Sequence, residues 1–206
     1  LMVRSQTKVN RNIIEAGKKL KIIGRAGVGV DNIDVNSATE KGIIVVNSPD
    51  GNTIAASEHT IALMLAISRN IVPASQSTKE GKWNRDAFTG TELFGKTLGV
   101  MGFGRIGRKV VNIALSIGMK VIVYDPFANE EMVNKKGALY ETSLDNFLKT
   151  LDYLSIHIPK TSDTINIINK ENINKMKKGA IIINCSRGGL VNENDLKEAL
   201  ENGQIS

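Results

Sequence analysis

The chain contains a single cysteine, Cys185, and this excludes an internal disulfide framework. One cysteine fits a reducing cytoplasm, which is where we expect the protein to reside. Long apolar runs are also missing: Ile61–Ile67 is among the longest and is far short of the roughly 20 residues that cross a bilayer. Nothing resembles a signal peptide. We therefore expect a soluble protein without a membrane partner.

Aromatic residues make up only 4% of the chain, so side chains that could stack on nucleotide bases are scarce. The formal net charge is +6, and nucleic-acid binding through this charge would be strongly salt-sensitive. However, the basic residues are scattered along the chain, as in Lys18–Lys21, Lys135–Lys136 and Lys175–Lys178. This pattern favours solvated lysines on helix faces. A second interpretation is that positive potential attracts an anionic cofactor and a small acid, and we expect no nucleic-acid partner.

Short apolar runs alternate with segments of helical periodicity, without repeats or low-complexity tracts. This alternation predicts the α/β class, with parallel strands joined by crossover helices and covered on both faces. The expected strands are Leu1–Val3, Lys21–Ile23, Ile43–Asn47, Leu98–Met101, Val121–Tyr124, Tyr153–His157 and Ile181–Asn184. The expected helices are Asn12–Leu20, Val35–Lys41, Ile106–Ile117 and Glu130–Lys136.

A longer helix is expected from Thr53 to about Lys79, because its apolar residues keep helical spacing. Its length and apolarity predict packing on more than one side. The following stretch, Gly81–Gly95, is polar and predicts a loop. Trp83, the only tryptophan, lies in this loop, where a local anchor and an interface residue both remain open interpretations.

The segment Gly102–Gly107 has the spacing G-x-G-x-x-G, directly after an expected strand and before an expected helix. In this context the first glycine permits a tight turn, Gly104 lets the backbone approach a diphosphate, and the last glycine lets helix and strand pack closely. The helix start directs N–H groups and its positive dipole end at the phosphates. We expect Arg105 and Ile106 to contact the cofactor, with Arg105 adding a charge.

Asp125 follows the next expected strand, about 20 residues further on, where the dinucleotide fingerprint has an acidic residue. Its carboxylate would accept hydrogen bonds from the adenosine ribose and repel the 2′-phosphate that distinguishes NADP from NAD. No Arg or Lys lies between Asp125 and Lys135 to bind that phosphate. The sequence therefore predicts NAD as the cofactor.

The segment Ile181–Val191 begins as a buried strand and continues with polar residues and an arginine that is followed by glycines. Together with Leu98–Gly107 and Arg25–Asn32, this segment resembles the D-isomer-specific 2-hydroxy-acid dehydrogenase family. The similarity extends over essentially the whole chain. Leu1–Ser5 and Gly81–Trp83 resemble the phosphoglycerate dehydrogenase branch of the family in particular.

The resemblance implies a Rossmann NAD-binding domain with a doubly wound parallel sheet at residues 51–206, and part of a flavodoxin-like substrate-binding domain at residues 1–50. The implied activity is the NAD-dependent oxidation of D-3-phosphoglycerate to 3-phosphooxypyruvate, the first step of serine biosynthesis. Reduction of hydroxypyruvate or glyoxylate, oxidation of D-lactate, and a non-catalytic NAD-sensing module remain alternatives. Since the family dimerises through its nucleotide domain, we expect a homodimer or homotetramer.

The resemblance makes Arg187 the catalytic arginine, which holds the substrate carboxylate at two points and polarises the carbonyl oxygen. Without the resemblance, a surface ion pair is the usual role of an arginine after a strand. The implied substrate-binding residues are Arg4 and Arg25, with the backbone N–H groups of Val28 and Gly29. For Arg4, a structural salt bridge is the alternative.

At the nicotinamide end the resemblance implies contacts from His157, Ile158, Cys185 and Ser186, beside Arg187. A packing role for His157 remains open, and Cys185 is not expected to be a nucleophile, because hydride transfer requires none. No metal ion is implied. The family's catalytic glutamate and histidine are implied to follow the last residue, so we expect this chain alone to bind cofactor without turnover.

Overall fold

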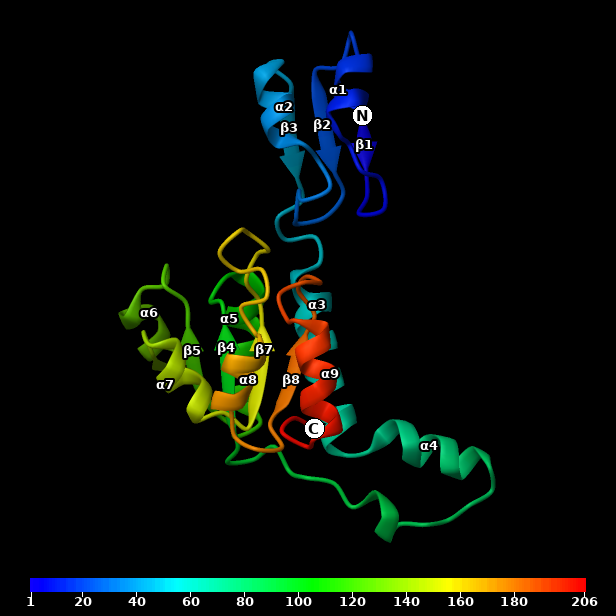
Figure 1. Cartoon of the computed structure of the whole chain (residues 1–206), viewed down its shortest axis with the longest axis vertical. Coiled ribbons are helices and arrows are strands. Elements are labelled where there is room, and N and C mark those ends of the chain that lie inside the picture. Colours follow the sequence, from blue (N-terminus) through cyan, green and yellow to red (C-terminus); the bar gives the residue numbers. More distant parts are fainter. The chain divides into compact units, whose positions relative to one another are not determined.

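The computed structural model describes all 206 residues, which form two compact units, Leu1–Ala55 and Ala56–Ser206 (Figure 1). None of the helices combines the length and apolar character needed to span a membrane. The elements are β1 Met2–Val3, α1 Arg11–Ala16, β2 Ile22–Arg25, α2 Val35–Glu40, β3 Ile44–Asn47, α3 Thr53–Ser68, α4 Ile71–Lys79, the 3₁₀ turn η1 Asp86–Phe88, β4 Thr97–Met101, α5 Arg105–Ser116, β5 Lys120–Tyr124, α6 Glu130–Asn134, β6 Leu139–Tyr140, α7 Leu144–Lys149, β7 Tyr153–Ile156, α8 Lys170–Lys175, β8 Ile181–Asn184 and α9 Glu193–Glu201.

The smaller unit contains a three-stranded parallel sheet in the order β1-β2-β3. One face packs into a core that includes Val3 and Ile23 from the sheet and Ile14 from α1. Side chains of the opposite face are exposed, among them Met2, of which 82% is exposed. The expected coverage of both sheet faces is therefore not met in the smaller unit, where β1 is an edge strand of a sheet that this chain covers on one face.

The larger unit contains a five-stranded parallel sheet in the order β6-β5-β4-β7-β8. From the central strand β4 the chain moves outward to β5 and β6, and then returns to add β7 and β8 on the other side of β4. The order of the strands thus reverses between β4 and β7. The predicted α/β class and doubly wound parallel sheet are confirmed, and this reversal is where such sheets bind ligands.

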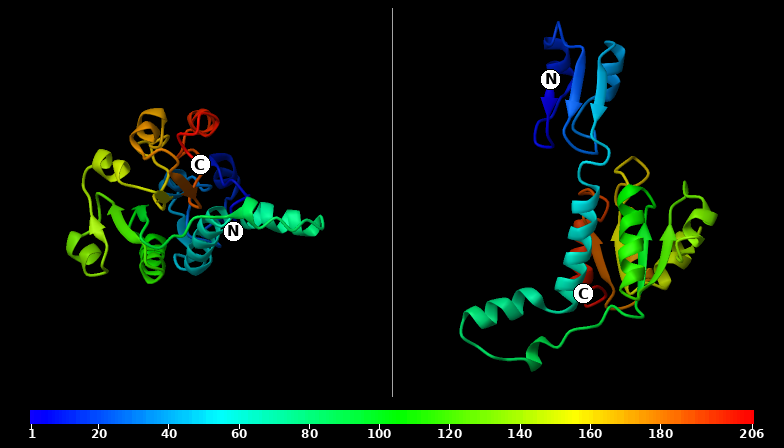
Figure 2. Two further views of the ribbon diagram at one scale, coloured as in Figure 1. Left: turned by 90° about the horizontal axis from the view of Figure 1, so that it is seen from below. Right: turned by 180° about the vertical axis from the view of Figure 1, so that it is seen from behind.

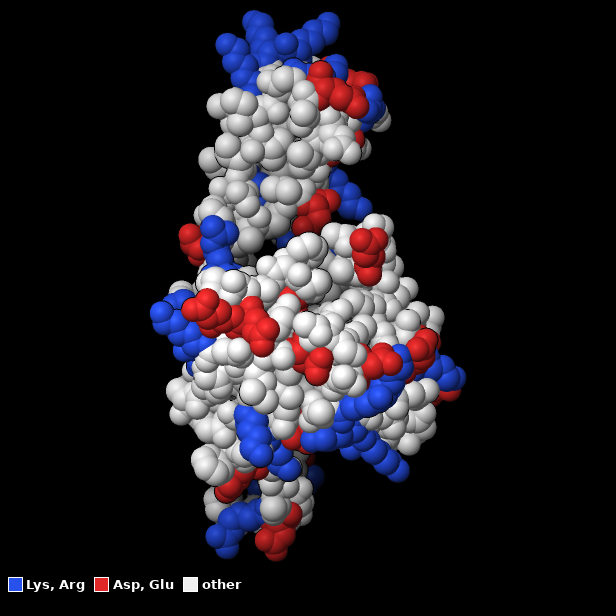
Figure 3. Space-filling model, turned by 90° about the vertical axis from the view of Figure 1, so that its left-hand side faces the viewer, with Lys and Arg blue, Asp and Glu red and all other residues white.

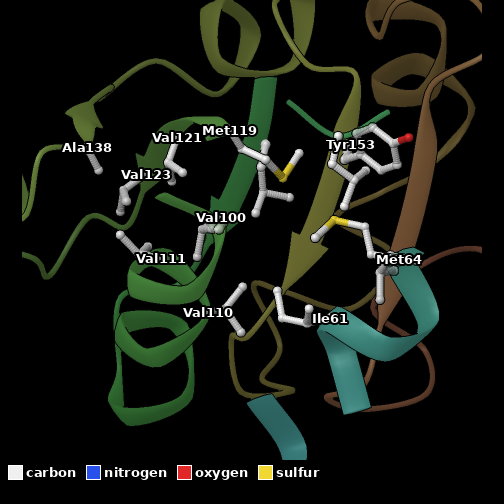
Figure 4. Packing of buried hydrophobic residues seen from close by; sticks show 14 of the residues in the cluster. Ile61, Met64, Val100, Val110, Val111, Met119, Val121, Val123, Ala138 and Tyr153 are labelled. Carbon is white, nitrogen blue, oxygen red and sulfur yellow. The ribbon is translucent and has the colours of Figure 1, made fainter. Parts of the chain in front are cut away.

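Both faces of this sheet are covered, as the apolar strand sequences predict. One cluster joins the strands to α3 and α5 through residues such as Met64 and Val110 (Figure 4). The other cluster joins them to α7, α8 and α9 through Phe147, Ile173 and Ala199. Four of the flanking helices, α6 to α9, begin at an Asn or Ser whose side chain accepts a backbone N–H, which fixes where each helix starts.

The expected single helix over residues 53–79 is two helices, α3 and α4. The break lies at Asn70, which has a left-handed backbone with φ of 52°. Pro73 explains it, because in a continuous helix its ring would clash with the carbonyl of Arg69 and remove one hydrogen bond. Behind the break, α4 and the segment that follows it project away from the sheet (Figure 2), and α4 has no buried residue.

Acidic and basic side chains are interspersed over the larger unit on the face shown in Figure 3. Several lysines on the surface of this unit make ion pairs: Lys175 contacts both Asp145 and Glu171, and Lys170 contacts Glu198. Such exposed pairs contribute little to stability, at most about 1 kcal/mol each. These lysines therefore lie among carboxylates and do not form a basic patch of their own.

Candidate functional site

The turn between β4 and α5 lies at the strand-order reversal. Gly102 has φ of +100°, a conformation that glycine adopts without strain, and its N–H donates to the Tyr124 carbonyl at 2.9 Å. A Cβ on Gly102 would lie 2.8 Å from the His157 carbonyl. Only glycine therefore lets β4 turn into α5 directly beside the end of β7.

The start of α5 fits a diphosphate group. Gly104 is the N-cap residue and provides no side-chain cap, so the first N–H groups of the helix are left to other acceptors. A Cβ added to Gly104 would meet no atom within 4 Å, which shows open space above the turn. Gly107, in contrast, is buried, and a Cβ there would collide with the Gly102 carbonyl. Arg105 is exposed, whereas Ile106 packs partly against the core.

Asp125 follows β5 and faces the same turn. One carboxylate oxygen accepts the Phe103 N–H at 2.7 Å and the other accepts the Phe127 N–H at 2.9 Å. Its own carbonyl accepts the Tyr140 hydroxyl at 2.9 Å. Because each carboxylate oxygen has further lone pairs, both can also accept hydrogen bonds from sugar hydroxyls. The β4–α5 turn thus orients the carboxylate beside the open space over Gly104.

His157 and Ile158 extend β7 at the other side of the turn. The imidazole is half-buried, and its Nε2 lies 2.7 Å from the Ser155 hydroxyl. Burial lowers the pKa of His157 to about 4, because a charged imidazolium loses its hydration there. The ring is therefore neutral near pH 7. The methyl group of Ile158 lies against the Gly102 turn.

Cys185, Ser186 and Arg187 follow β8, next to the end of β7. The Ser186 hydroxyl donates to the Ile158 carbonyl at 2.7 Å and ties the two strand ends together. Asn184 accepts the Ser186 N–H and donates to the Arg187 carbonyl at 2.8 Å, so its amide shapes the turn on which the arginine lies. Arg187 is half-buried, with Nη1 donating to the Ser186 carbonyl at 2.9 Å. Cys185 packs partly against the core.

The larger unit thus brings all the predicted cofactor-site residues to the carboxyl ends of β4, β5, β7 and β8. The predicted substrate residues lie in the smaller unit, at or directly after the carboxyl ends of β1 and β2; they are Arg4, Arg25, Val28 and Gly29. Within each unit the predicted residues come together at one sheet edge, as parallel strands require.

Arg25 ends β2, and its guanidinium lies directly over Gly27, where any Cβ would overlap Nη1. Its Nε is buried and has no hydrogen-bond partner. A buried cationic donor without an acceptor is costly, so an anion or water would stabilise it. Next to it, Asn47 donates to the Val28 carbonyl at 2.6 Å. The Val28 carbonyl and the Gly29 N–H belong to one trans peptide and point in opposite directions. The bond to Asn47 therefore leaves the Gly29 N–H pointing away from Asn47.

The sequence interpretation missed several polar residues that hold the strand ends of each unit in shape. They are Asn32, Asn47, Ser155 and Asn184. Two of them, Asn47 and Asn184, are the last residues of strands, a position where asparagine often bonds to nearby backbone rather than continuing the ladder. That signal was present in the sequence.

A match to known proteins now identifies the family. Residues 61–206 match the model of the D-isomer specific 2-hydroxyacid dehydrogenase, NAD binding domain. The chain belongs to the D-isomer specific 2-hydroxyacid dehydrogenase family. Its larger unit is an NAD-binding domain, and the predictions of family, domain type and cofactor are confirmed.

Members of this dehydrogenase family are similar to the chain over its whole length. It is 54% identical over 205 residues to D-3-phosphoglycerate dehydrogenase of Synechocystis sp. and 53% identical over 205 residues to that of Methanocaldococcus jannaschii. These alignments cover 100% of this chain but 37% and 39% of the relatives, so the chain spans about two fifths of their length. Hydroxypyruvate reductase of Thermotoga maritima is 49% identical, with coverage of 100% and 66%.

Solved dehydrogenase structures have the same fold. D-lactate dehydrogenase from Aquifex aeolicus, solved with NAD and lactic acid, has a TM-score of 0.91 at 35% identity and covers 99% of this chain and 61% of its own. A Granulicella formate dehydrogenase has a TM-score of 0.94 at 28% identity, with coverage of 99% and 56%.

Two glycine substitutions separate packing from ligand approach in the β4–α5 turn. Gly107→Ala is expected to lower the free energy of unfolding by about 1–3 kcal/mol, because its methyl group collides with the Gly102 carbonyl. Gly104→Ala is expected to change it by less than about 1 kcal/mol. Both should weaken NADH binding at least about tenfold in calorimetry. Unchanged NADH affinity in Gly104→Ala would show that no diphosphate approaches this residue.

The buried imidazole of His157 makes stability depend on pH. The unfolded chain takes up the histidine proton below about pH 6.5, whereas the folded chain takes it up only near pH 4. Stability is therefore lost as the pH falls through this window, by up to about 3 kcal/mol. Denaturant unfolding at pH 7.5 and pH 4.5 should show a smaller loss in His157→Gln than in wild type. Asn194→Gln, on the exposed surface of α9, is the control and should behave as wild type.

Proposed function

We propose that the complete protein oxidises D-3-phosphoglycerate to 3-phosphooxypyruvate, with reduction of NAD⁺ to NADH and release of a proton. The observation that carries this proposal is the 54% identity to a D-3-phosphoglycerate dehydrogenase over the length of this chain. The reaction is the first step of serine biosynthesis. The geometry of both strand-end sites is compatible with it.

In this proposal the crevice at the ends of β4, β5, β7 and β8 holds NAD. The N–H groups at the start of α5 bind the diphosphate, aided by the helix dipole, and Asp125 accepts the adenosine ribose hydroxyls. The strand ends at His157–Ile158 and Cys185–Ser186 line the nicotinamide end. Bound NAD⁺ supplies a hydride acceptor. Because the neutral His157 ring carries no charge, it adds no repulsion toward a cationic nicotinamide.

Three arginines recognise the substrate. The Arg187 guanidinium binds the carboxylate at two points and polarises the oxygen on the reacting carbon. In the smaller unit, the buried, unpartnered Nε of Arg25 and the N–H groups of Val28 and Gly29 offer hydrogen-bond donors to a substrate carboxylate. Arg4 is exposed after β1 and binds the phosphate. In this scheme only the phosphorylated substrate needs Arg4, because an unphosphorylated hydroxy acid has no phosphate for it to bind.

We further propose that residues 1–50 are part of a substrate-binding domain. The uncovered apolar face of the three-stranded sheet supports this assignment, since apolar sheet faces are normally buried against further protein. The side chains on this face are Met2, Ile22, Ile44 and Val46.

Kinetics of the complete protein test the substrate assignment. Wild type should reduce NAD⁺ with D-3-phosphoglycerate, and Arg4→Ala should lower kcat/KM for it by about 10- to 100-fold, through loss of a charged hydrogen bond. The same change should leave D-lactate or D-glycerate turnover nearly unaltered. Arg187→Lys, which keeps the charge and loses the two-point geometry, should lower turnover of every substrate. Absence of phosphoglycerate activity in wild type would refute the proposal.

Hydroxypyruvate reduction is the second candidate, favoured by the 49% identity to the Thermotoga maritima hydroxypyruvate reductase. It predicts higher kcat/KM for hydroxypyruvate than for 3-phosphooxypyruvate in the reverse reaction. It also predicts that Arg4→Ala affects both substrates equally. The experiment above therefore separates the two candidates.

We also propose that the protein is a homo-oligomer that associates through α3, α4 and the segment containing Trp83. Apolar side chains are exposed throughout this region, with Val72 72% and Trp83 79% exposed. A groove of about 450 Å³ opens between these helices and β8, lined mostly by apolar residues. Contiguous apolar surface of this kind is typical of an interface. The exposed flank of α3 supports the earlier expectation of packing on more than one side.

Introducing a charge tests the proposed interface. Val72→Glu places a carboxylate within the apolar groove and should raise the dissociation constant of the oligomer at least about 30-fold. Sedimentation velocity on the complete protein measures this constant. Met132→Glu, on the exposed surface of α6, is the matched control and should leave the assembly unchanged. Equal effects of the two variants would place the interface elsewhere.

A further inference from the structure

The segment Arg4–Val9 is held against the loop that ends at Asp34 by four hydrogen bonds. The Asn32 side-chain Nδ2 donates to the Arg4 carbonyl at 2.9 Å and to the Thr7 carbonyl at 2.6 Å. The Asn32 carbonyl accepts the Val9 N–H at 2.7 Å, and the Asp34 N–H donates to the Val9 carbonyl at 2.8 Å. Asn32 therefore makes three of the four bonds, and its side chain alone spans both ends of the Arg4–Thr7 turn.

These contacts fix which way the Asn32 amide faces. A flipped amide would point its oxygen at two carbonyl oxygens, which accept but cannot donate hydrogen bonds. The Oδ1 atom is consequently directed away from the turn, and it is buried without a partner. The Nε of Arg25, at the strand end from which this loop begins, is likewise buried without a partner. An unpaired acceptor and an unpaired donor in one loop indicate a place where water or a ligand completes the hydrogen bonding.

The turn is held only through its main chain, so the Arg4 side chain remains available to contact a ligand. Arg4 is exposed and its guanidinium makes no ion pair. The start of this turn is fixed by the Ala26 N–H, which donates to the Val3 carbonyl at 2.9 Å, and its end is fixed by the main chain of Val9. Between these two points the Asn32 amide provides the side-chain bonds that hold the turn, so it influences where the Arg4 charge lies relative to the Arg25–Gly29 segment.

We propose that Asn32 is a positioning residue, which clamps the Arg4 turn onto the Arg25–Gly29 loop and thereby sets the distance between the phosphate-binding and carboxylate-binding ends of the substrate site. This proposal rests on the function proposed above. Asn32 acts through Arg4, so its contribution should exist for phosphorylated substrates and vanish when Arg4 is absent.

A double-mutant cycle in the complete protein tests the clamp. Asn32→Ala should raise the KM for D-3-phosphoglycerate about tenfold or more, with KM for NAD⁺ unchanged within about twofold and a small effect on KM for D-glycerate. In an Arg4→Ala background the same substitution should raise the KM for D-3-phosphoglycerate less than about threefold. Asn36→Ala, on the exposed surface of α2, is the matched control and should change neither KM.

Additive effects of Asn32→Ala and Arg4→Ala, an equal loss with D-glycerate, or an unchanged KM would each overturn the proposal. Asn32→Leu, which keeps the side-chain size and removes the hydrogen bonds, provides a second variant if alanine prevents folding. NADH affinity reports that the rest of the variant is folded.

Limited trypsin digestion separates failure of the clamp from failure of the proposed function. Cleavage after Arg4 and Lys8 should be faster in Asn32→Ala or Asn32→Leu than in wild type, without any substrate present. Unchanged cleavage would overturn the clamp even in an active enzyme. Faster cleavage in a protein that does not oxidise D-3-phosphoglycerate would keep the clamp and remove its assigned substrate.

Discussion

Close backbone packing at the β4–α5 turn is the constraint on which the nucleotide domain depends. Gly102 lies against the carbonyl of His157, and Gly107 lies against the carbonyl of Gly102. These approaches bring the first turn of α5 to the point where the strand order reverses. With a side chain at either glycine, the helix start would move away from the end of β7, and the residues after the other strands would no longer surround a common crevice.

Most of this domain could be predicted because its signals are local. The apolar strands, the glycine spacing and Asp125 lie in one sequence pattern, and parallel pairing then brings the ends of the strands to one edge. The split between α3 and α4 was also encoded locally, by Asn70 and Pro73, although the expected helix was extended across them.

Contacts between distant segments could not be predicted in this way. Asn32 reaches carbonyls 25 and 28 residues away, and Ser186 reaches a carbonyl 28 residues away, so neither partner is visible from spacing. The exposure of Met2 likewise depends on which strand is at the edge and which face lacks helices. The sequence places each site residue at a sheet edge, whereas its chemistry depends on the groups that it meets there.

The hydrogen bond from the Phe103 N–H to Asp125 couples the stability of the domain to its choice between NAD and NADP. A bond to a charged acceptor of this kind contributes about 1.5–3 kcal/mol, and here it joins the loop after β5 to the turn after β4. Replacing the carboxylate to admit a 2′-phosphate would also remove this support. A lineage that changes its redox coenzyme at this position must therefore gain stability elsewhere, so such a change is expected to require several mutations.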